Sequence, residues 1–256
     1  MTIDGDARPK SYRVREGEEV AYEPAVAASE APRRAAPFRI AYEDEHLLVV
    51  DKPAGVVVHP GAGNLEGTLA QALAEHGAEG GEEGRGGIVH RLDRDTSGLL
   101  VVARSHEAHR RLQELVRRRE LEREYLALVR GKPRSRAGRI EAPVGRDRRD
   151  PTRQSLDTEA PREAVTHFEL VELLPRHALL RVGLETGRMH QIRVHLAAIG
   201  LPVSGDPSYG IARDLELERQ FLHAARLAFV HPFGGDPVVV DSPLPPDLAA
   251  ALERAR

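Results

Sequence analysis

Residues 88–105, IVHRLDRDTSGLLVVARS, decide the fold of this chain. The part from Gly98 onward is a short apolar run, which is typical of a buried strand. The part before it places one histidine, two arginines and two aspartates within the six positions 90–95. Charged residues directly before a buried strand indicate either a solvated turn or a catalytic loop held on a rigid sheet.

Asp93 lies at the centre of this charged loop. A carboxylate in that place is suited to act as a nucleophile, a general base or a metal ligand. A lone aspartate in a turn more often caps backbone N–H groups. Because the same loop also carries His90, Arg91 and Arg94, which a plain turn does not need, we take Asp93 as a candidate catalytic residue.

The pattern around this loop predicts more strands than helices. Apolar runs and alternation predict strands at 46–53, 98–105, 121–131 and 221–232, and a hairpin from 164–174 and 177–187. Helical spacing predicts helices at 67–77, at 105–120 with Ser105 as N-cap, and at 187–200. Many strands are close enough in sequence to pair antiparallel. The predicted class is therefore α+β, with a large mixed, mostly antiparallel sheet flanked by helices and loops.

The composition along the chain predicts one main domain with a small N-terminal segment. Residues 1–24 alternate in short strand-like pieces, and residues 25–37 are Ala- and Pro-rich without periodicity, as in a linker. Residues 38–256 are densely patterned. With 256 residues, 41% of them hydrophobic, the chain is long enough to bury a core.

The residue content excludes some classes of chemistry. The sequence contains no cysteine, so disulfides, thiolate nucleophiles and cysteine-bound zinc are excluded. No N-terminal apolar segment and no membrane-length apolar run is present, so we expect a soluble, cytoplasmic protein without a membrane partner.

The charge distribution is more informative than the net charge of −3. Residues 130–153 carry nine Lys and Arg against three Asp and Glu, and three further arginines stand at 117–119. A locally basic face on an acidic protein suits RNA phosphates. Abundant arginine from a GC-rich genome explains the same run equally well.

A second polar cluster occupies residues 186–196, TGRMHQIRVHL. His190 and Arg193 are three positions apart and share a helical face. An arginine that faces inward needs a carboxylate partner, for which Asp93 is the candidate. His190 and His195 are five apart, which splays their rings, so we expect no metal site.

Tyr125 and the loop at 51–64 complete the candidate residues. Tyr125 shares a strand face with Arg123 that we expect to be polar, and it either stacks on a base or is an ordinary core-edge tyrosine. His59 and Asn64 lie in the Gly- and Pro-rich loop, where they could contact phosphate or base. This loop lacks the lysine and Ser/Thr pair of a nucleoside triphosphate site.

Together, these segments resemble the RluA-type family of RNA pseudouridine synthases. The similarity runs in family order over about residues 38–240, and HRLDxxTSG followed by HQIRVH is its most specific part. The segments HPGAGN and APVGR are similar to the branch that modifies large-subunit ribosomal RNA. The resemblance implies the pseudouridine synthase fold, an RNA partner, and no cofactor or metal. Met189 departs from the family, which usually has a small hydroxyl residue there.

The resemblance also implies roles for particular residues. Asp93 matches the catalytic aspartate, which attacks the ribose or the uracil ring so that the glycosidic bond breaks and the uracil rejoins through C5. Arg193 matches the residue that orients the aspartate, and Tyr125 the one that stacks on uracil and helps to remove the C5 proton. Arg91 matches the arginine that fills the gap left by the flipped uridine. The other expected RNA contacts are His90, Arg94, His59, Asn64, Arg188, His190 and Arg146.

Three alternatives to a ribosomal RNA enzyme remain at this point. They are a transfer RNA pseudouridine synthase, a non-catalytic RNA-binding protein of ribosome assembly, and a glycosidase with two carboxylates. Residues 2–20 resemble the second half of an S4 RNA-binding domain whose helical first half is missing, which indicates a truncated domain or a late start. An unrelated hairpin is the other explanation. We expect the protein to be a monomer.

Overall fold

The computed structural model describes residues 2–3, 5–7, 12–21, 36–61, 64–82, 85–150 and 152–256. The chain divides into two compact units, Met1–Arg34 and Ala35–Arg256. Three short strands form the sheet of the first unit in the order β2-β1-β3: β1 (Thr2–Ile3), β2 (Asp6–Ala7) and β3 (Val20–Ala21). Most of the predicted linker 25–37 lies outside the described residues, and the S4-like character of residues 1–24 stays a prediction.

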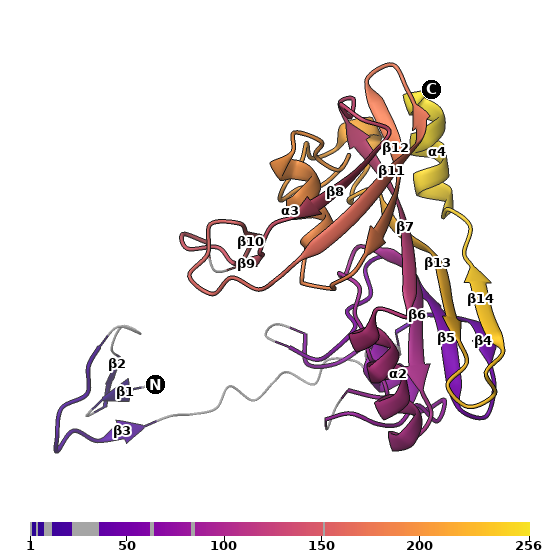
Figure 1. Cartoon of the computed structure of the whole chain (residues 1–256). Helices are drawn as coiled ribbons and strands as arrows, with labels where there is room; N and C mark the ends of the chain where they lie inside the picture. The colour runs from indigo at the N-terminus through magenta and orange to yellow at the C-terminus, as the bar shows by residue number, and fades with distance from the viewer. Residues whose placement is uncertain are drawn as a thin grey trace. The chain divides into compact units, whose positions relative to one another are not determined.

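A nine-stranded sheet organises the second unit (Figure 1). Its strands are β4 (Arg39–Glu43), β5 (Leu47–Lys52), β6 (Ser97–Ala103), β7 (Glu122–Arg130), β8 (Ala137–Glu141), β11 (Val165–Leu173), β12 (His177–Leu184), β13 (Leu222–Val230) and β14 (Pro237–Asp241). Their order is β4-β5-β6-β13-β7-β12-β11-β8, with β14 paired to β13. Only β6 and β13 pair in parallel among these strands. The predicted α+β class with a mostly antiparallel sheet is confirmed.

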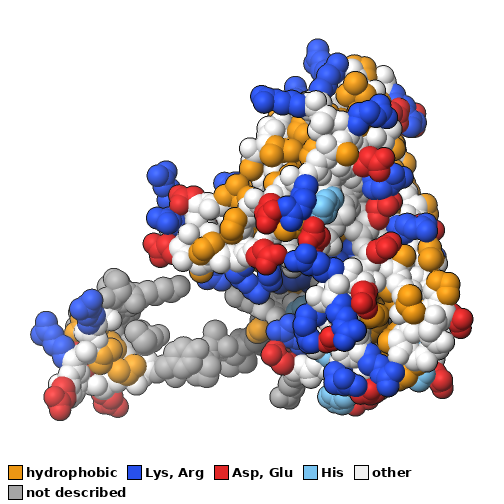
Figure 2. Space-filling model, viewed as in Figure 1, with side chains coloured by type: hydrophobic (Ala, Val, Ile, Leu, Met, Phe, Trp, Pro, Cys, Tyr) orange, Lys and Arg blue, Asp and Glu red, His pale blue; other side chains and the backbone are white. Residues whose placement is uncertain are grey.

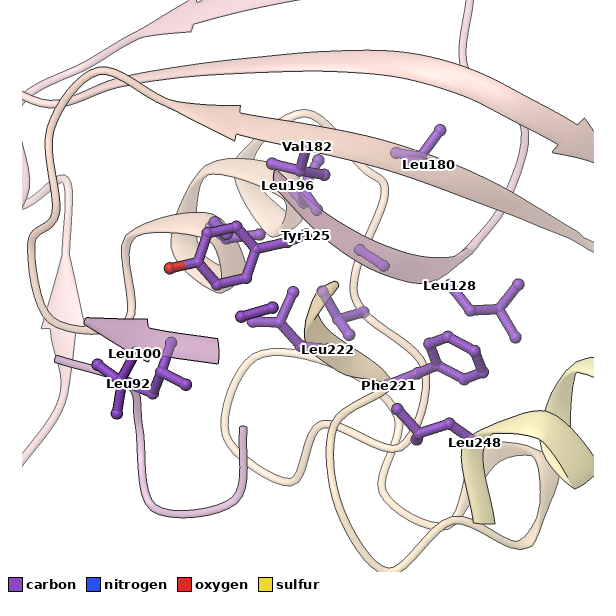
Figure 3. Packing of buried hydrophobic residues seen from close by; sticks show 14 of the residues in the cluster. Leu92, Leu100, Tyr125, Leu128, Leu180, Val182, Leu196, Phe221, Leu222 and Leu248 are labelled. Carbon is purple, nitrogen blue, oxygen red and sulfur yellow. The ribbon is translucent and has the colours of Figure 1, made fainter. Parts of the chain in front are cut away.

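Helices cover both faces of this sheet. They are α1 (Leu69–Ala74), α2 (His106–Arg118), α3 (Gln191–Ala198) and α4 (Pro246–Ala255), with a 3-10 turn at Asp214–Glu216 and a small β9–β10 pair at Gly145–Arg146 and Gln154–Ser155. Leu99 and Val101 of β6 pack with α2, whereas Leu100 and Val102 belong to the cluster that contains residues of α1, α3 and α4. The apolar run of β6 is therefore buried on both faces, and Figure 3 shows part of the larger cluster.

The helix ends follow from local interactions. Ser105 caps α2 as predicted, because its hydroxyl accepts a hydrogen bond from the Ala108 N–H at 3.1 Å. The helix predicted from residue 187 begins only at Gln191, because His190 has a left-handed backbone with φ of 57°. Helix α4 was not predicted. No helix in the described part of the chain is long and apolar enough to cross a bilayer.

Gly98 fixes the junction between the charged loop and β6. Its φ of 112° favours glycine, and a Cβ atom there would come within 2.2 Å of the Ala224 carbonyl oxygen on β13. The glycine of the DTSG segment is thus needed where β6 and β13 pair closely. This pairing places the residues just before Gly98 at the end of a buried strand.

Candidate active site

The loop that carries Asp93 is held by buried polar side chains. The fully buried amino group of Lys52 donates to the Arg94 carbonyl at 2.8 Å, and also to the carbonyls of Pro53 and Val56. The carbonyl of the following residue, Asp95, accepts a hydrogen bond from Arg219 at 3.1 Å. These hydrogen bonds to successive carbonyls restrict the backbone directly after Asp93. The loop is therefore anchored, as a loop that positions a reacting group must be.

Asp93 is paired with Arg193, as predicted from the sequence. Arg193 Nη1 lies 3.1 Å from Asp93 Oδ2, and the two side chains are 6% and 15% exposed. The sequence did not indicate the second carboxylate: Asp206 accepts from Arg193 Nε at 2.6 Å and from Nη2 at 2.8 Å. Since Asp206 is fully buried, this two-point contact holds Arg193, which then points its remaining nitrogen at Asp93.

His190 lies between Asp93 and Tyr209 in a chain of close polar contacts. His190 Nδ1 is 2.9 Å from the Tyr209 hydroxyl, and its Nε2 is 4.0 Å from Asp93 Oδ2. Burial lowers the pKa of His190, and the nearby charge of Asp93 opposes this effect. Arg193 also lies 5.0 Å from the centre of the Tyr209 ring. The carboxylate of Asp93 thus faces a cation and a polar ring.

Tyr125 lines the same cavity as Asp93, His190 and Arg193, which we call the catalytic pocket. The prediction of a polar strand face was wrong. The face of β7 that holds Tyr125 and Arg123 is buried, and both side chains are under 10% exposed. Figure 3 shows the Tyr125 ring among leucine and valine side chains. Burial raises the pKa of Tyr125 against the opposing effect of the Arg123 charge, so its hydroxyl is protonated at neutral pH.

A larger cavity of about 700 Å³ adjoins the catalytic pocket. Its described lining contains no carboxylate but six arginines, which define what we call the arginine groove: Arg85, Arg91, Arg123, Arg146, Arg162 and Arg188. Figure 2 shows Lys and Arg side chains on both sides of the hollow between the part with β9 and β10 and the part with α2. A groove lined by one sign of charge attracts a polyanion.

Five of the expected RNA contacts line this groove, and His90 is one of them. Arg91 and Arg188 line both the groove and the catalytic pocket, and Arg146 and His59 line the groove alone. Burial lowers the pKa of His59 to about 4, so its imidazole is neutral at pH 7. His59 therefore offers hydrogen bonding there rather than charge.

His90, Arg94 and Asn64 differ in their environments. His90 lines the groove, but its Nε2 accepts from the Val101 N–H at 3.2 Å and its Nδ1 is buried. Arg94 is exposed and paired with Asp95 at 3.0 Å. Asn64 is exposed on its loop and lines neither the groove nor the catalytic pocket. His90 thus supports the strand β6 through this hydrogen bond, and its expected role in RNA binding stays a prediction.

The three arginines at 117–119 are partly neutralised within the protein. Arg117 and Arg118 both pair with Glu114, and Arg119 pairs with Glu163 and Glu185. The local charge excess at 117–119 is therefore smaller than the sequence suggests.

Within the described ranges, no group of three or more His, Cys, Asp or Glu side chains is arranged to hold a metal ion.

Residues 46–198 match the family model described as RNA pseudouridylate synthase. A ribosomal large subunit pseudouridine synthase D from Nitrosomonas europaea is 46% identical over 87% of this chain, and this chain covers 66% of that relative's length. The protein of that name from Xanthomonas campestris is 42% identical over 99% of this chain and 80% of the relative.

The solved structures agree with the sequence relatives. The human RNA pseudouridylate synthase domain containing 1 superimposes with a TM-score of 0.68 at 28% identity, over 84% of this chain and 88% of that chain. The matched family model contains both the Asp93 loop and Arg193, and covers more than half of the sequence. The chain therefore belongs to the RNA pseudouridylate synthase family.

Proposed function

We propose that this chain converts uridine to pseudouridine in a stem-loop of large-subunit ribosomal RNA. The observation that carries the proposal is the Asp93 carboxylate, held 3.1 Å from Arg193 in a pocket that Tyr125 also lines. The names of the relatives from N. europaea and X. campestris support the ribosomal substrate. The arginine groove beside the pocket supports a nucleic acid partner.

The proposed reaction uses groups that the pocket contains. Asp93 attacks either C1′ of the ribose or the uracil ring, and the bond between N1 and C1′ breaks. The uracil turns, a bond forms between C5 and C1′, and the bond to Asp93 breaks, which frees the carboxylate. The C5 hydrogen leaves as a proton and N1 gains one. The product is therefore an isomer of the substrate, without a change of oxidation state.

Arg193 and Tyr125 support this reaction in different ways. Arg193 fixes the direction of the Asp93 carboxylate, because Asp206 holds the other two guanidinium nitrogens. Since the Tyr125 hydroxyl stays protonated at neutral pH, its ring is better suited to stack on the uracil than to take the C5 proton. The aromatic platform and the carboxylate then lie on two sides of one base.

RNA enters the site as an extruded nucleotide. A base inside a duplex cannot reach a carboxylate in a pocket, so the uridine must turn out of its stack. Arg91 lines both the catalytic pocket and the arginine groove, which is a suitable position for a side chain that fills the vacated place.

Pseudouridine mapping of total RNA tests the function. A strain that lacks this gene is compared with strains that express the wild-type chain or Asp93→Asn. We expect sites in large-subunit ribosomal RNA to disappear in the deletion strain and to return only with the wild-type chain. Loss confined to transfer RNA would overturn the ribosomal substrate, and full return with Asp93→Asn would overturn the mechanism.

A further inference from the structure

Arg123 has no ionic partner among the described residues. It lies on β7, two residues before Tyr125, and is 7% exposed. Its Nε atom is buried without a hydrogen-bond partner, and among the described residues no carboxylate forms a salt bridge with it. Its one recorded hydrogen bond runs from Nη2 to the Leu184 carbonyl at 3.4 Å, which is long for such a bond.

A buried arginine without a partner is costly. Removing a guanidinium from water costs several kcal/mol, which an opposite charge or well-formed hydrogen bonds normally offset. For Arg193 in the same pocket, two aspartates supply the opposite charge that offsets this cost. Arg123 lacks such a partner among the described residues, so its charge is available to an anion from outside.

The position of Arg123 gives such an anion a route of access. Arg123 lines both the catalytic pocket and the arginine groove, together with Arg91, Gly187, Arg188 and Met189. A Cβ atom at Gly187 would lie 2.9 Å from Arg123 Nη1, so the glycine leaves room for the guanidinium. The charged group therefore stands at the junction of the two cavities, beside the place for the reacting uridine.

We propose that Arg123 binds one backbone phosphate directly next to the extruded uridine. This proposal rests on the RNA substrate proposed above and adds the group that places its backbone. A phosphate supplies the missing negative charge, and a guanidinium binds it with two parallel hydrogen bonds. Uracil is neutral and cannot supply that charge. Arg123 is thus a positioning residue, which fixes where the ribose lies relative to Asp93.

Single-phosphate substitution in the RNA tests the contact. A stem-loop with the mapped uridine carries one neutral methylphosphonate at each of the two phosphates on either side in turn. Binding is measured with Asp93→Asn proteins, so that the RNA stays unmodified. We expect one position to weaken binding by about 10- to 100-fold when Arg123 is present, as for a charge-assisted hydrogen bond.

The same RNAs are then bound to the Arg123→Met variant. We expect the unmodified RNA to bind as weakly as the methylphosphonate RNA does to the parent, with no further loss from the substitution. Arg123→Lys should recover part of the affinity. Arg226→Met is the matched control, because Arg226 pairs with Asp241 at 2.9 Å and lines neither cavity.

The outcomes separate this proposal from its alternatives. If Arg123→Met still loses affinity with every methylphosphonate that affects the parent, Arg123 does not contact these phosphates. If Arg123→Met is far less stable and the wild-type side chain shows no phosphate dependence, the residue is structural and the proposal is overturned. If the wild-type chain binds with the expected dependence but forms no pseudouridine in this RNA, the proposed function fails and the phosphate site stands.

Discussion

Arg193 is the residue whose removal should disturb this site most. Arg193→Met keeps most of the aliphatic length and deletes the guanidinium. Asp206, which is fully buried, then loses charged donors at 2.6 and 2.8 Å. It keeps only the N–H groups of Ser208 and Tyr209, at 2.8 and 3.1 Å. The substitution thus leaves a partly satisfied carboxylate in the interior.

The expected loss of stability is large. Removing one member of a buried ion pair costs about 3–5 kcal/mol, a large share of the roughly 5–15 kcal/mol that stabilises a typical domain. Adding Asp206→Asn to Arg193→Met removes the stranded charge, so we expect the double variant to be more stable than the single one. Asp93→Asn leaves the contact between Arg193 and Asp206 intact and should cost about 1 kcal/mol or less.

Urea denaturation at pH 7 measures these differences. The chain contains no tryptophan, so unfolding is followed by far-ultraviolet circular dichroism. Hydrogen bonds from Arg193 lower the pKa of Asp206 against the effect of burial. Its contribution is therefore present above the unfolded carboxyl pKa of about 4 and is lost as the pH falls through the lower folded pKa. The difference between wild type and Arg193→Met should narrow in acid.

Two results would refute this account of the pair. One is an Arg193→Met variant with the same urea midpoint as the wild type, which would show that the pair contributes nothing. The other is a double variant no more stable than Arg193→Met, because relief of a stranded charge is the reason given for the loss.

Three further predictions concern the scaffold and the RNA. Gly98→Ala should lower the melting temperature, because a Cβ would meet the Ala224 carbonyl at 2.2 Å; an unchanged melting curve would contradict this. Burial lowers the pKa of Lys52 to about 7, so above that pH the unfolded state binds more protons than the folded state. The free energy of unfolding should therefore rise between about pH 7 and 10 in the wild type, and rise less in Lys52→Met. Deletion of residues 1–30 should change RNA affinity little and leave a steep salt dependence, whereas a large loss would assign the main RNA contacts to the N-terminal unit.

The sequence indicated the elements whose signals are local. The apolar run of β6 and the Ser105 cap were both predicted and are confirmed. Helix α4 also had a local signal, with proline at its start and buried Leu248, Ala251, Leu252 and Ala255 at helical spacing. The local sequence of α4 therefore does indicate a helix.

The remaining parts of the site depend on tertiary contacts that no local pattern contains. Asp206 stands between glycine and proline and is typical of a turn, and only the fold brings it to Arg193. Arg123 suggested a polar strand face, but the sheet buries it beside Tyr125. Gly187 leaves room for the Arg123 guanidinium, and the catalytic pocket and the arginine groove both reach it. These features explain how a charged side chain fits at this position.

Release of the C5 hydrogen tests the central claim most directly. The ribosomal stem-loop is prepared with tritium at C5 of the mapped uridine, and the tritium released to water is counted together with any free uracil. The account predicts release of one tritium per pseudouridine with the wild-type chain, none with Asp93→Asn, and no free uracil with either. Substantial tritium release by pure Asp93→Asn protein, or free uracil as the wild-type product, would contradict it.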